Sequence, residues 1–308
     1  MRSSISKLMK RLPPDCYHRV RRLGLRLLSA WPRSRLQTLS YKEIKSAVEC
    51  LPTACIPRVI HQIWLGPERP PLGTMESCRQ ANPGWLYVLW TDRNLPPMFN
   101  RRAFDEFGTA YHGKADVLRY EVLCRFGGVY VDADQLCLRS FDDLVGPDDT
   151  FFAGYQNLGN PDLDEEQQGT TLVANAVLGA SRRNPIIEQL IRHIGDSPVD
   201  TKSLAWLTVG PAALTKAIEA TPSRAVVYPF HEFYPYHFLE EIPASPDDMV
   251  KAIHYRSHSV SLWGTTLGTY QKCRLLPGLK SGRTSSTREV PAEFAARHPR
   301  LAATVYHG

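Results

Sequence analysis

Two aspartates separated by one residue, Asp132 and Asp134, stand at the end of the apolar run "FGGVYVDADQLCL". Side chains alternate across a β-strand, so a strand that continues through this stretch turns both carboxylates to one side and Ala133 to the other. Two negative charges this close repel each other unless a cation or a proton intervenes. Because carboxylate oxygens suit Mn²⁺ and Mg²⁺, the pair predicts a metal site, and a solvated strand end is the plain alternative.

An acidic and a basic side chain, Asp116 and Arg119, lie three residues apart in "GKADVLRYEVLCRFGG". This stretch has the pattern of a helix that Gly127 and Gly128 end. Residues three apart on a helix are neighbours on one face. Two interpretations remain open, an ion pair within the helix or a binding site for a sugar or a phosphate.

Strands and helices alternate around these two motifs. The expected strands are residues 58–64, 85–92 and 129–132, and the expected helices are residues 41–51, 74–81, 98–108 and 113–126. This alternation predicts an α/β fold in which a mostly parallel sheet has helices on both faces. Ligands bind such sheets beyond the carboxyl ends of the strands, where Trp64, Thr91, Asp92 and the two motif aspartates fall.

The charge of the chain is concentrated at its beginning. The 308 residues carry a net charge of +6, but residues 1–36 hold ten basic residues and one acid, and the remainder is slightly acidic. A general nucleic-acid footprint is therefore not expected. Residues 20–31 have an apolar stripe flanked by arginines, which predicts a helix on an anionic membrane surface or a helix packed on the main domain. We expect a basic helical extension over residues 1–52, one domain over 53–275 and a tail over 276–308.

The cysteines and the apolar segments bear on the cellular location. Seven cysteines, an odd number without C-x-x-C spacing, predict reduced thiols and neither a disulfide framework nor a zinc site. No apolar stretch approaches the ~20 residues that span a bilayer, and the N-terminus lacks the apolar core of a secretory signal. The expected location is the cytoplasm, on the inner face of the membrane if the basic helix binds lipid.

Several motifs occur in an order that resembles glycosyltransferase family 32, the sugar transferases with a D-x-D motif related to the yeast initiating mannosyltransferase and to bacterial capsule enzymes. These motifs are "IPRVIHQIWLG", "NPGWLYVLWTD", "KADVLRYEVLCRFGGVYVDADQ", "NAVLGA" and "VGPAAL". The resemblance covers residues 56–263, and its most specific block is A-D-x-x-R-Y…G-G-x-Y-x-D-x-D. It implies a GT-A type fold, a UDP- or GDP-sugar donor, a divalent metal that is usually manganese, and transfer with retention of anomeric configuration.

The resemblance also implies roles for individual residues. Asp134 is the closer metal ligand, and Asp132 reaches the metal through water or contacts the sugar and ribose. A third ligand is expected late in the chain, from His254, which ends an apparent strand, or from His258. The residues implied at the donor and at the reacting sugar are Trp64 on the base, Asp116, Arg119, Tyr120, Gly210, Trp263 and Asn175.

The predicted function is therefore metal-dependent transfer of a sugar from a nucleotide-diphosphate sugar to a glycan, glycolipid or protein acceptor. The leaving group of such a donor carries two or three negative charges, which a metal neutralises. Two alternatives from other classes are a haloacid-dehalogenase-type phosphatase, whose nucleophile strand "VYVDADQL" resembles, and an inactive scaffold that binds a membrane or partner. The phosphatase requires this motif on the first core strand, whereas a strand and a helix precede it here.

Overall fold

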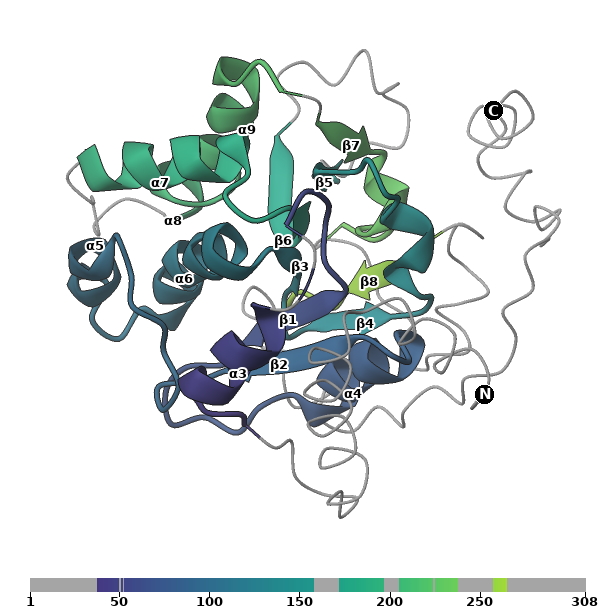
Figure 1. Ribbon diagram of the computed structural model, residues 1–308, viewed down its shortest axis with the longest axis horizontal. Helices are drawn as coiled ribbons and strands as arrows, with labels where there is room; N and C mark the ends of the chain where they lie inside the picture. Colours follow the sequence, from purple (N-terminus) through teal and green to yellow (C-terminus); the bar gives the residue numbers. More distant parts are fainter. Residues whose placement is uncertain are drawn as a thin grey trace, which may run out of the picture.

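The strands form a six-stranded sheet and a separate two-stranded ribbon (Figure 1). The structure is a computed structural model that describes residues 38–49, 51, 53–157, 172–196, 205–223, 225–237 and 257–264. Its strands are β1 (Val59–Ile63), β2 (Leu86–Trp90), β3 (Gly128–Val131), β4 (Gln135–Cys137), β5 (Phe151–Tyr155), β6 (Val173–Ala180), β7 (Val226–Tyr228) and β8 (Ser259–Ser261). Its helices are α3 (Tyr41–Val48), α4 (Leu72–Ala81), α5 (Arg101–Glu106), α6 (Tyr111–Phe126), α7 (Pro185–Asp196), α8 (Ala205–Thr208) and α9 (Pro211–Ala220), with 3₁₀ turns η1 (Phe141–Leu144) and η2 (Phe230–Glu232).

The large sheet has the strand order β2-β1-β3-β6-β5-β7. Strand β1 pairs in parallel with β2 and β3, and β5 pairs in parallel with β7, whereas β6 is antiparallel to both of its neighbours. All strands except β6 therefore run in one direction. The beginning of β6 lies at the same edge of the sheet as the carboxyl end of β3, because Val177 is opposite Val131.

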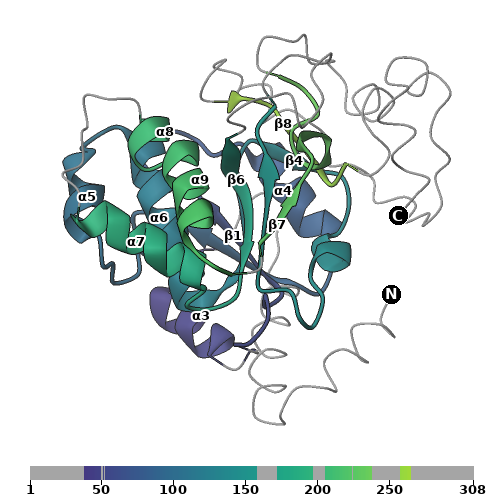
Figure 2. The same cartoon turned by 90° about the horizontal axis from the view of Figure 1, so that it is seen from above.

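Helices cover both faces of this sheet (Figure 2). One face carries α6, α7 and α9, and the other carries α4 and the β4–β8 ribbon. Two large clusters of buried apolar side chains fill the spaces between these layers. The predicted α/β architecture, with a mostly parallel sheet and helices on both faces, is confirmed.

The connection from α6 to β3 depends on two glycines. Gly127 has φ 60° and Gly128 has φ 110°, a region that residues with a side chain rarely adopt. A Cβ atom on Gly128 would lie 2.6 Å from the carbonyl oxygen of Val59 on β1. The neighbouring His61 ring nitrogen Nε2 lies 2.8 Å from the carbonyl oxygen of Gly127. The close approach of β1 and β3 thus explains why the predicted helix stop has two glycines.

Helix α3, which falls within the predicted N-terminal extension, packs on the core of the following residues. Ser40 and Glu43 form a reciprocal capping box at the start of α3, which lies within the predicted extension. Ile44 and Val48 of α3 are fully buried in the cluster that also holds α6 and α7, so α3 belongs to the main domain. Residues 20–31 and 276–308 lie outside the described residues. Among the helices that are described, none has both the length and the apolarity that crossing a bilayer requires.

The cysteine prediction is wrong for one pair. A disulfide joins Cys78 of α4 to Cys137 of β4, 59 residues apart in the sequence, whereas Cys55 and Cys124 are free. The absence of C-x-x-C spacing excludes only local pairing. The two cysteines meet because α4 packs on β4, and no pattern in the sequence reports that contact.

Candidate active site

The D-x-D motif lies directly after β3, as predicted, but it forms a turn and not an extension of the strand. Strand β3 ends at Val131, and the amide of Gln135 donates to the carbonyl oxygen of Asp132 at 3.1 Å. The chain turns here because β4 leaves the large sheet to pair with β8. The proximity of the two carboxylates is therefore a property of the turn, and the alternation of side chains along a strand does not produce it.

The carboxylate of Asp132 is held by two side chains. The hydroxyl of Tyr130 donates to its Oδ1 at 2.5 Å, and Nη1 of Arg119 lies 3.3 Å from the same oxygen. The guanidinium of Arg119 also lies over the Tyr130 ring, 4.5 Å from its centroid. The side chain of Asp132 is 30% exposed, whereas that of Arg119 is 5% exposed. Asp132 thus presents one carboxylate oxygen to solvent from a fixed position.

A buried polar network lies behind Asp132. Nη2 of Arg119 lies 2.8 Å from Oδ1 of Asp116, and Nη1 donates to the carbonyl oxygen of Asn175 at 2.7 Å. The side-chain amide of Asn175 donates to Asp116 at 2.9 Å and to the Tyr120 hydroxyl at 3.0 Å. Burial raises the pKa of Asp116, and the charge of Arg119 opposes that rise. The helix pair Asp116–Arg119 is therefore part of a network that reaches β6 and the D-x-D turn.

Asp134 contacts the late segment of the chain. Its Oδ2 accepts from the amide of Gly264 at 2.7 Å, and its carbonyl oxygen accepts from the amide of Leu262 at 3.2 Å. Burial, followed by the charge of Asp132, raises the pKa of Asp134 to about 7. The fold therefore disfavours a negative charge on Asp134 when no cation is beside it.

The two predicted tryptophans lie beside the turn. Trp64 packs against the small cluster that contains Ala133, the middle residue of the D-x-D motif. Trp263 immediately precedes Gly264 and has φ 51°, an unusual value for a bulky residue, and its ring nitrogen donates to the carbonyl oxygen of Tyr236 at 3.0 Å. Both rings are half-buried, so each presents part of its surface to solvent near the motif.

Gly210 lies farther along the same layer, at the N-terminus of α9. The hydroxyl of Thr215 on this helix accepts from the amide of Val173, two residues before Asn175. Helix α9 therefore borders the edge of the sheet where Asn175 lies. Gly210 itself bonds to α8 and α9: its amide donates to the carbonyl oxygen of Ala205, and its carbonyl oxygen accepts from the amide of Leu214.

The two histidine candidates for the metal have different outcomes. His254 lies outside the described residues. Strand β8 pairs Ser261 with Gln135 and Ser259 with Cys137, which places His258 beside Leu138, four residues from Asp134. Its Nδ1 lies 2.5 Å from Oε1 of Glu232, and its ring stacks on Phe141. The register of β8 therefore does not bring His258 to the two aspartates.

The donor set around the turn suits a hard divalent cation. Asp132 and Asp134 supply carboxylate oxygens, and neither Nδ1 of His258 nor a thiol joins them. Within the described segments there is no cluster of three or more His, Cys, Asp or Glu side chains that could hold a metal. Mg²⁺ and similar ions are commonly held by one or two carboxylates together with substrate phosphates. The two aspartates fit that mode of binding.

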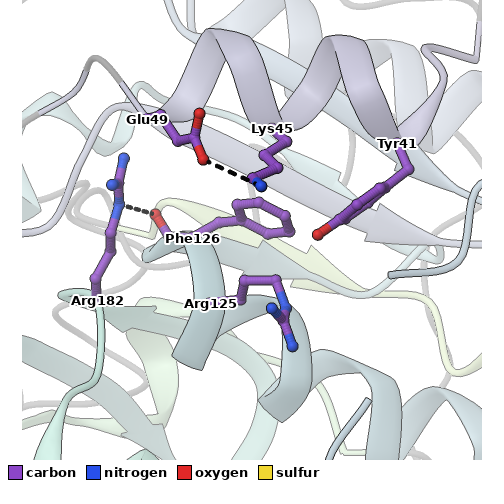
Figure 3. Close-up of a pocket in the computed structure, with 6 residues that line it drawn as sticks. All are labelled: Tyr41, Lys45, Glu49, Arg125, Phe126 and Arg182. Carbon is purple, nitrogen blue, oxygen red and sulfur yellow. Dashed lines mark hydrogen bonds and ion pairs between the residues drawn. The ribbon is translucent and has the colours of Figure 1, made fainter. Parts of the chain in front are cut away.

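A pocket of about 240 Å³ lies between α3 and α6, away from this site (Figure 3). Its lining residues are Tyr41, Lys45, Glu49, Arg125, Phe126 and Arg182. Arg182 donates to the carbonyl oxygens of Val48 and Phe126, and Lys45 lies 3.5 Å from Glu49. Arg125 and Phe126 precede β3, whereas Asp132 follows it, so the pocket is at the opposite edge of the sheet. Its arginine and carbonyl contacts are those expected where two helices end.

Sequence reasoning missed two residues of the site. Tyr130 lies two residues before Asp132, and the alternation of β3 could have placed both on one side. Gly264 lies 130 residues after Asp134, and no local signal predicts that its amide binds this carboxylate.

The segment that contains the D-x-D motif resembles known proteins in sequence. Residues 71–152 match the family model "Glycosyltransferase sugar-binding region containing DXD motif". This region belongs to the DXD-motif glycosyltransferases. The resemblance predicted from the sequence is thereby confirmed.

The relatives of the chain include two proteins of Schizosaccharomyces pombe. Inositol phosphoceramide mannosyltransferase 3 is 30% identical over 150 residues, which are 46% of this chain and 38% of that protein. Inositol phosphoceramide mannosyltransferase 1 is 37% identical over 101 residues, 29% of this chain and 31% of that protein. The match thus spans about a third of the length of each relative.

Among solved structures, the chain is similar to a glycosyltransferase involved in the glycosylation of the major capsid of PBCV-1. The TM-score is 0.42 and the identity 11%, over 70% of this chain and 98% of that chain.

Proposed function

We propose that the chain transfers a sugar from a nucleoside-diphosphate donor to a hydroxyl acceptor, with retention of anomeric configuration and with a divalent metal. The observation that carries this proposal is the buried network of Asp116, Arg119 and Asn175 directly behind Asp132. An ion pair that only stabilised α6 would not need to reach the partly exposed carboxylate of Asp132 after the end of β3. A network that fixes hydrogen-bonding groups at the edge of a sheet is suited to holding a polar ligand.

The residues have distinct proposed roles. Asp134 and Asp132 would hold the metal, which neutralises charge that develops on the diphosphate leaving group. Arg119 fixes Asp132 and steers sugar or phosphate, and Asp116 accepts hydrogen bonds from sugar hydroxyls. Asn175 faces the reacting sugar, and Trp64 stacks on the base. Tyr120 and Trp263 complete the donor pocket, with α9 and its Gly210 at the border.

The names of the relatives order the candidates for donor and acceptor. Those proteins are named for mannosyl transfer to inositol phosphoceramide, so a mannose donor and an inositol phospholipid are the first pair that we propose to test. A lipid acceptor fits the basic segment over residues 1–36, which would attach the protein to the inner face of an anionic membrane. Cosedimentation with anionic and neutral vesicles at low salt tests this attachment.

The function is tested by incubating the full chain with a panel of UDP- and GDP-sugars and Mn²⁺, and following hydrolysis and transfer to phosphoinositol lipids. We expect one donor to be consumed, chelator to stop the reaction, and NMR of the early product to show the anomeric configuration of the donor. Turnover that persists in chelator would contradict the metal, and an inverted product would contradict retention. A chain that neither binds nor consumes any nucleotide sugar would contradict the function.

Arg119→Lys separates a positioning role from a plain ion pair. Lysine keeps the charge but cannot hold Asp116, Asp132 and the Asn175 carbonyl together, so kcat/KM should fall by about 10²-fold. Arg101→Lys is the matched control, since Arg101 forms an exposed pair with Asp105 on α5. Equal kinetics in the two variants would remove Arg119 from the site.

A further inference from the structure

Side chains of β1 and α4 hold the backbone of the D-x-D turn. These two elements are distinct from α6 and β6, which carry the network around Arg119. Nε2 of Gln62 on β1 donates to the carbonyl oxygen of Asp132 at 3.1 Å. The hydroxyl of Thr74 on α4 lies 2.5 Å from the carbonyl oxygen of Ala133. Two consecutive carbonyls of the turn are therefore bound from outside the motif.

Gln62 is fixed at both ends of its amide. The side chain is fully buried, and its Oε1 accepts from the hydroxyl of Tyr87 on β2 at 2.6 Å. Because the acceptor end is occupied by Tyr87, the donor end must face Asp132. Strands β1 and β2 thus orient one peptide group of the turn.

Thr74 is fixed through its helix. It is fully buried in the first turn of α4, and the same helix contacts the chain beyond the motif. The Ser77 hydroxyl accepts from the amide of Cys137 at 2.9 Å, and Cys78 forms the disulfide with Cys137. Cys78 lies four residues after Thr74, on the same side of the helix. Helix α4 is thereby anchored on both sides of Asp134.

We propose that Gln62 and Thr74 are positioning residues that hold the D-x-D turn in its metal-binding conformation. This inference rests on the proposed function, since it takes Asp132 and Asp134 as the metal ligands. Two adjacent carboxylates repel each other when no metal is present, and rotation of either peptide group of the turn would relieve that repulsion. Fixing both carbonyls prevents the rotation, so the cation meets a preformed site and loses less affinity to ordering.

The test measures metal affinity and does not depend on turnover. Mn²⁺ is titrated into the full chain with UDP or GDP, whichever raises the Tm, and free Mn²⁺ is followed by electron paramagnetic resonance. The variants are Thr74→Val, which keeps the shape but removes the hydroxyl, and Gln62→Met, which keeps the length but removes the amide. Thr74→Ser restores the hydroxyl, and Thr221→Val is the control, because the Thr221 hydroxyl donates to the carbonyl oxygen of Ala217 at the end of α9, away from the turn.

We expect Thr74→Val and Gln62→Met each to weaken Mn²⁺ binding by about five- to tenfold, as the loss of one buried hydrogen bond implies, while kcat at saturating Mn²⁺ changes little. Thr74→Ser should restore wild-type affinity, and Thr221→Val should retain it. If Thr74→Val does not fold, the affinities of Gln62→Met and Thr74→Ser decide the matter.

Two results would overturn the inference: unchanged Mn²⁺ affinity in Thr74→Val and Gln62→Met, or an equal loss in Thr221→Val. A wild-type chain that binds Mn²⁺ with nucleotide but transfers no sugar would contradict the proposed function and leave this inference standing. A chain that transfers sugar in the presence of chelator and takes up no Mn²⁺ would overturn this inference and leave sugar transfer standing.

Discussion

Helices α7 and α4, which pack on opposite faces of the large sheet, bury different kinds of side chain. On the α7 side the buried residues of the helix are aliphatic, namely Ile186, Ile187, Leu190, Ile191 and Ile194. On the α4 side the buried residues include many polar ones, namely Gln62, Thr74, Ser77, Gln135 and Ser259. Among the described residues, the side-chain amide of Gln135 and the hydroxyl of Ser259 are buried without a hydrogen-bond partner.

This difference separates stability from positioning. Apolar burial is non-directional and contributes about 25 cal/mol per Å² wherever the area lies. Hydrogen bonds depend on distance and angle, and they contribute little net free energy but determine orientation. We infer that α7 mainly stabilises the fold, whereas α4, with its disulfide, mainly fixes the backbone of the D-x-D turn, and Arg119 of α6 holds the carboxylate of Asp132.

The largest expected effect comes from replacing Asp134 of the D-x-D turn, which should remove activity and leave the fold intact. Asp134→Asn should lower kcat/KM by about 10²- to 10³-fold, because a proposed metal ligand loses its charge. Burial raises the pKa of Asp134 to about 7, so the free energy of unfolding falls as the pH rises from the ordinary carboxyl pKa toward 7, and an amide removes this cost. The Tm of the metal-free variant at pH 8 should therefore equal or exceed that of the wild type.

Asp142→Asn is the matched control for this variant. Asp142 accepts from Arg58 and from the ring nitrogen of Trp85 on the same side of the sheet, outside the turn. Equal kinetic losses in Asp134→Asn and Asp142→Asn would mean that the turn has no special role.

The next effect compares the same substitution, leucine to alanine, on α7 and on β4. Leu190→Ala on α7 should lower the free energy of unfolding by about 2–5 kcal/mol and leave the kcat of the folded protein near the wild-type value. Leu136→Ala removes an equally buried side chain two residues after Asp134 and should lower both stability and kcat. Urea unfolding and steady-state kinetics measure the two quantities. A large kcat loss in Leu190→Ala would show that the packing of α7 also positions the active site.

The disulfide should affect both the stability of the fold and the D-x-D turn, because it joins α4 to β4. Cys78→Ser or reduction should lower the free energy of unfolding by about 2–4 kcal/mol, because the bond closes a long loop, and should raise the Mn²⁺ concentration needed for activity. Cys124→Ser on α6 replaces a buried free thiol and is the control. Mass spectrometry that finds Cys78 and Cys137 as free thiols in the native protein would contradict the assignment.

The smallest effect concerns two neighbouring residues of β1, His61 and Gln62, whose side chains lie on opposite faces of the sheet. Burial lowers the pKa of His61 to about 4, whereas in the unfolded chain it titrates near 6.5. The folded state therefore binds fewer protons, and stability is lost as the pH falls below 6.5 toward 4. We expect a loss of about 2 kcal/mol between pH 7 and pH 5, absent in His61→Gln.

Urea titrations at pH 7, 6 and 5 measure this change, with the exposed His112 replaced by Gln as the control. Mn²⁺ affinity should fall in Gln62→Met and stay unchanged in His61→Gln. A pH dependence that His61→Gln leaves intact would place the titrating group elsewhere.

Much of the fold and part of the site can be predicted from the sequence because they depend on local periodicity. The short apolar runs of β1 and β2, which Pro and Gly residues bound, and the pattern of α6 with its two terminal glycines give the elements and their order. The end of β3 and the identity of the two aspartates are local as well. The spacing of Asp116 and Arg119 places them on one face of α6, which the structure bears out through their ion pair.

Only the tertiary structure decides which distant residues meet. The antiparallel insertion of β6 brings Asn175 to Arg119, and the register of β8 brings Gly264 to Asp134 and directs His258 to Glu232. The packing of α4 on β4 creates the disulfide and turns the D-x-D motif away from the large sheet. A register shift of one residue reverses every side chain of a strand without changing its local pattern, so such contacts are set by packing and not by the sequence near each residue.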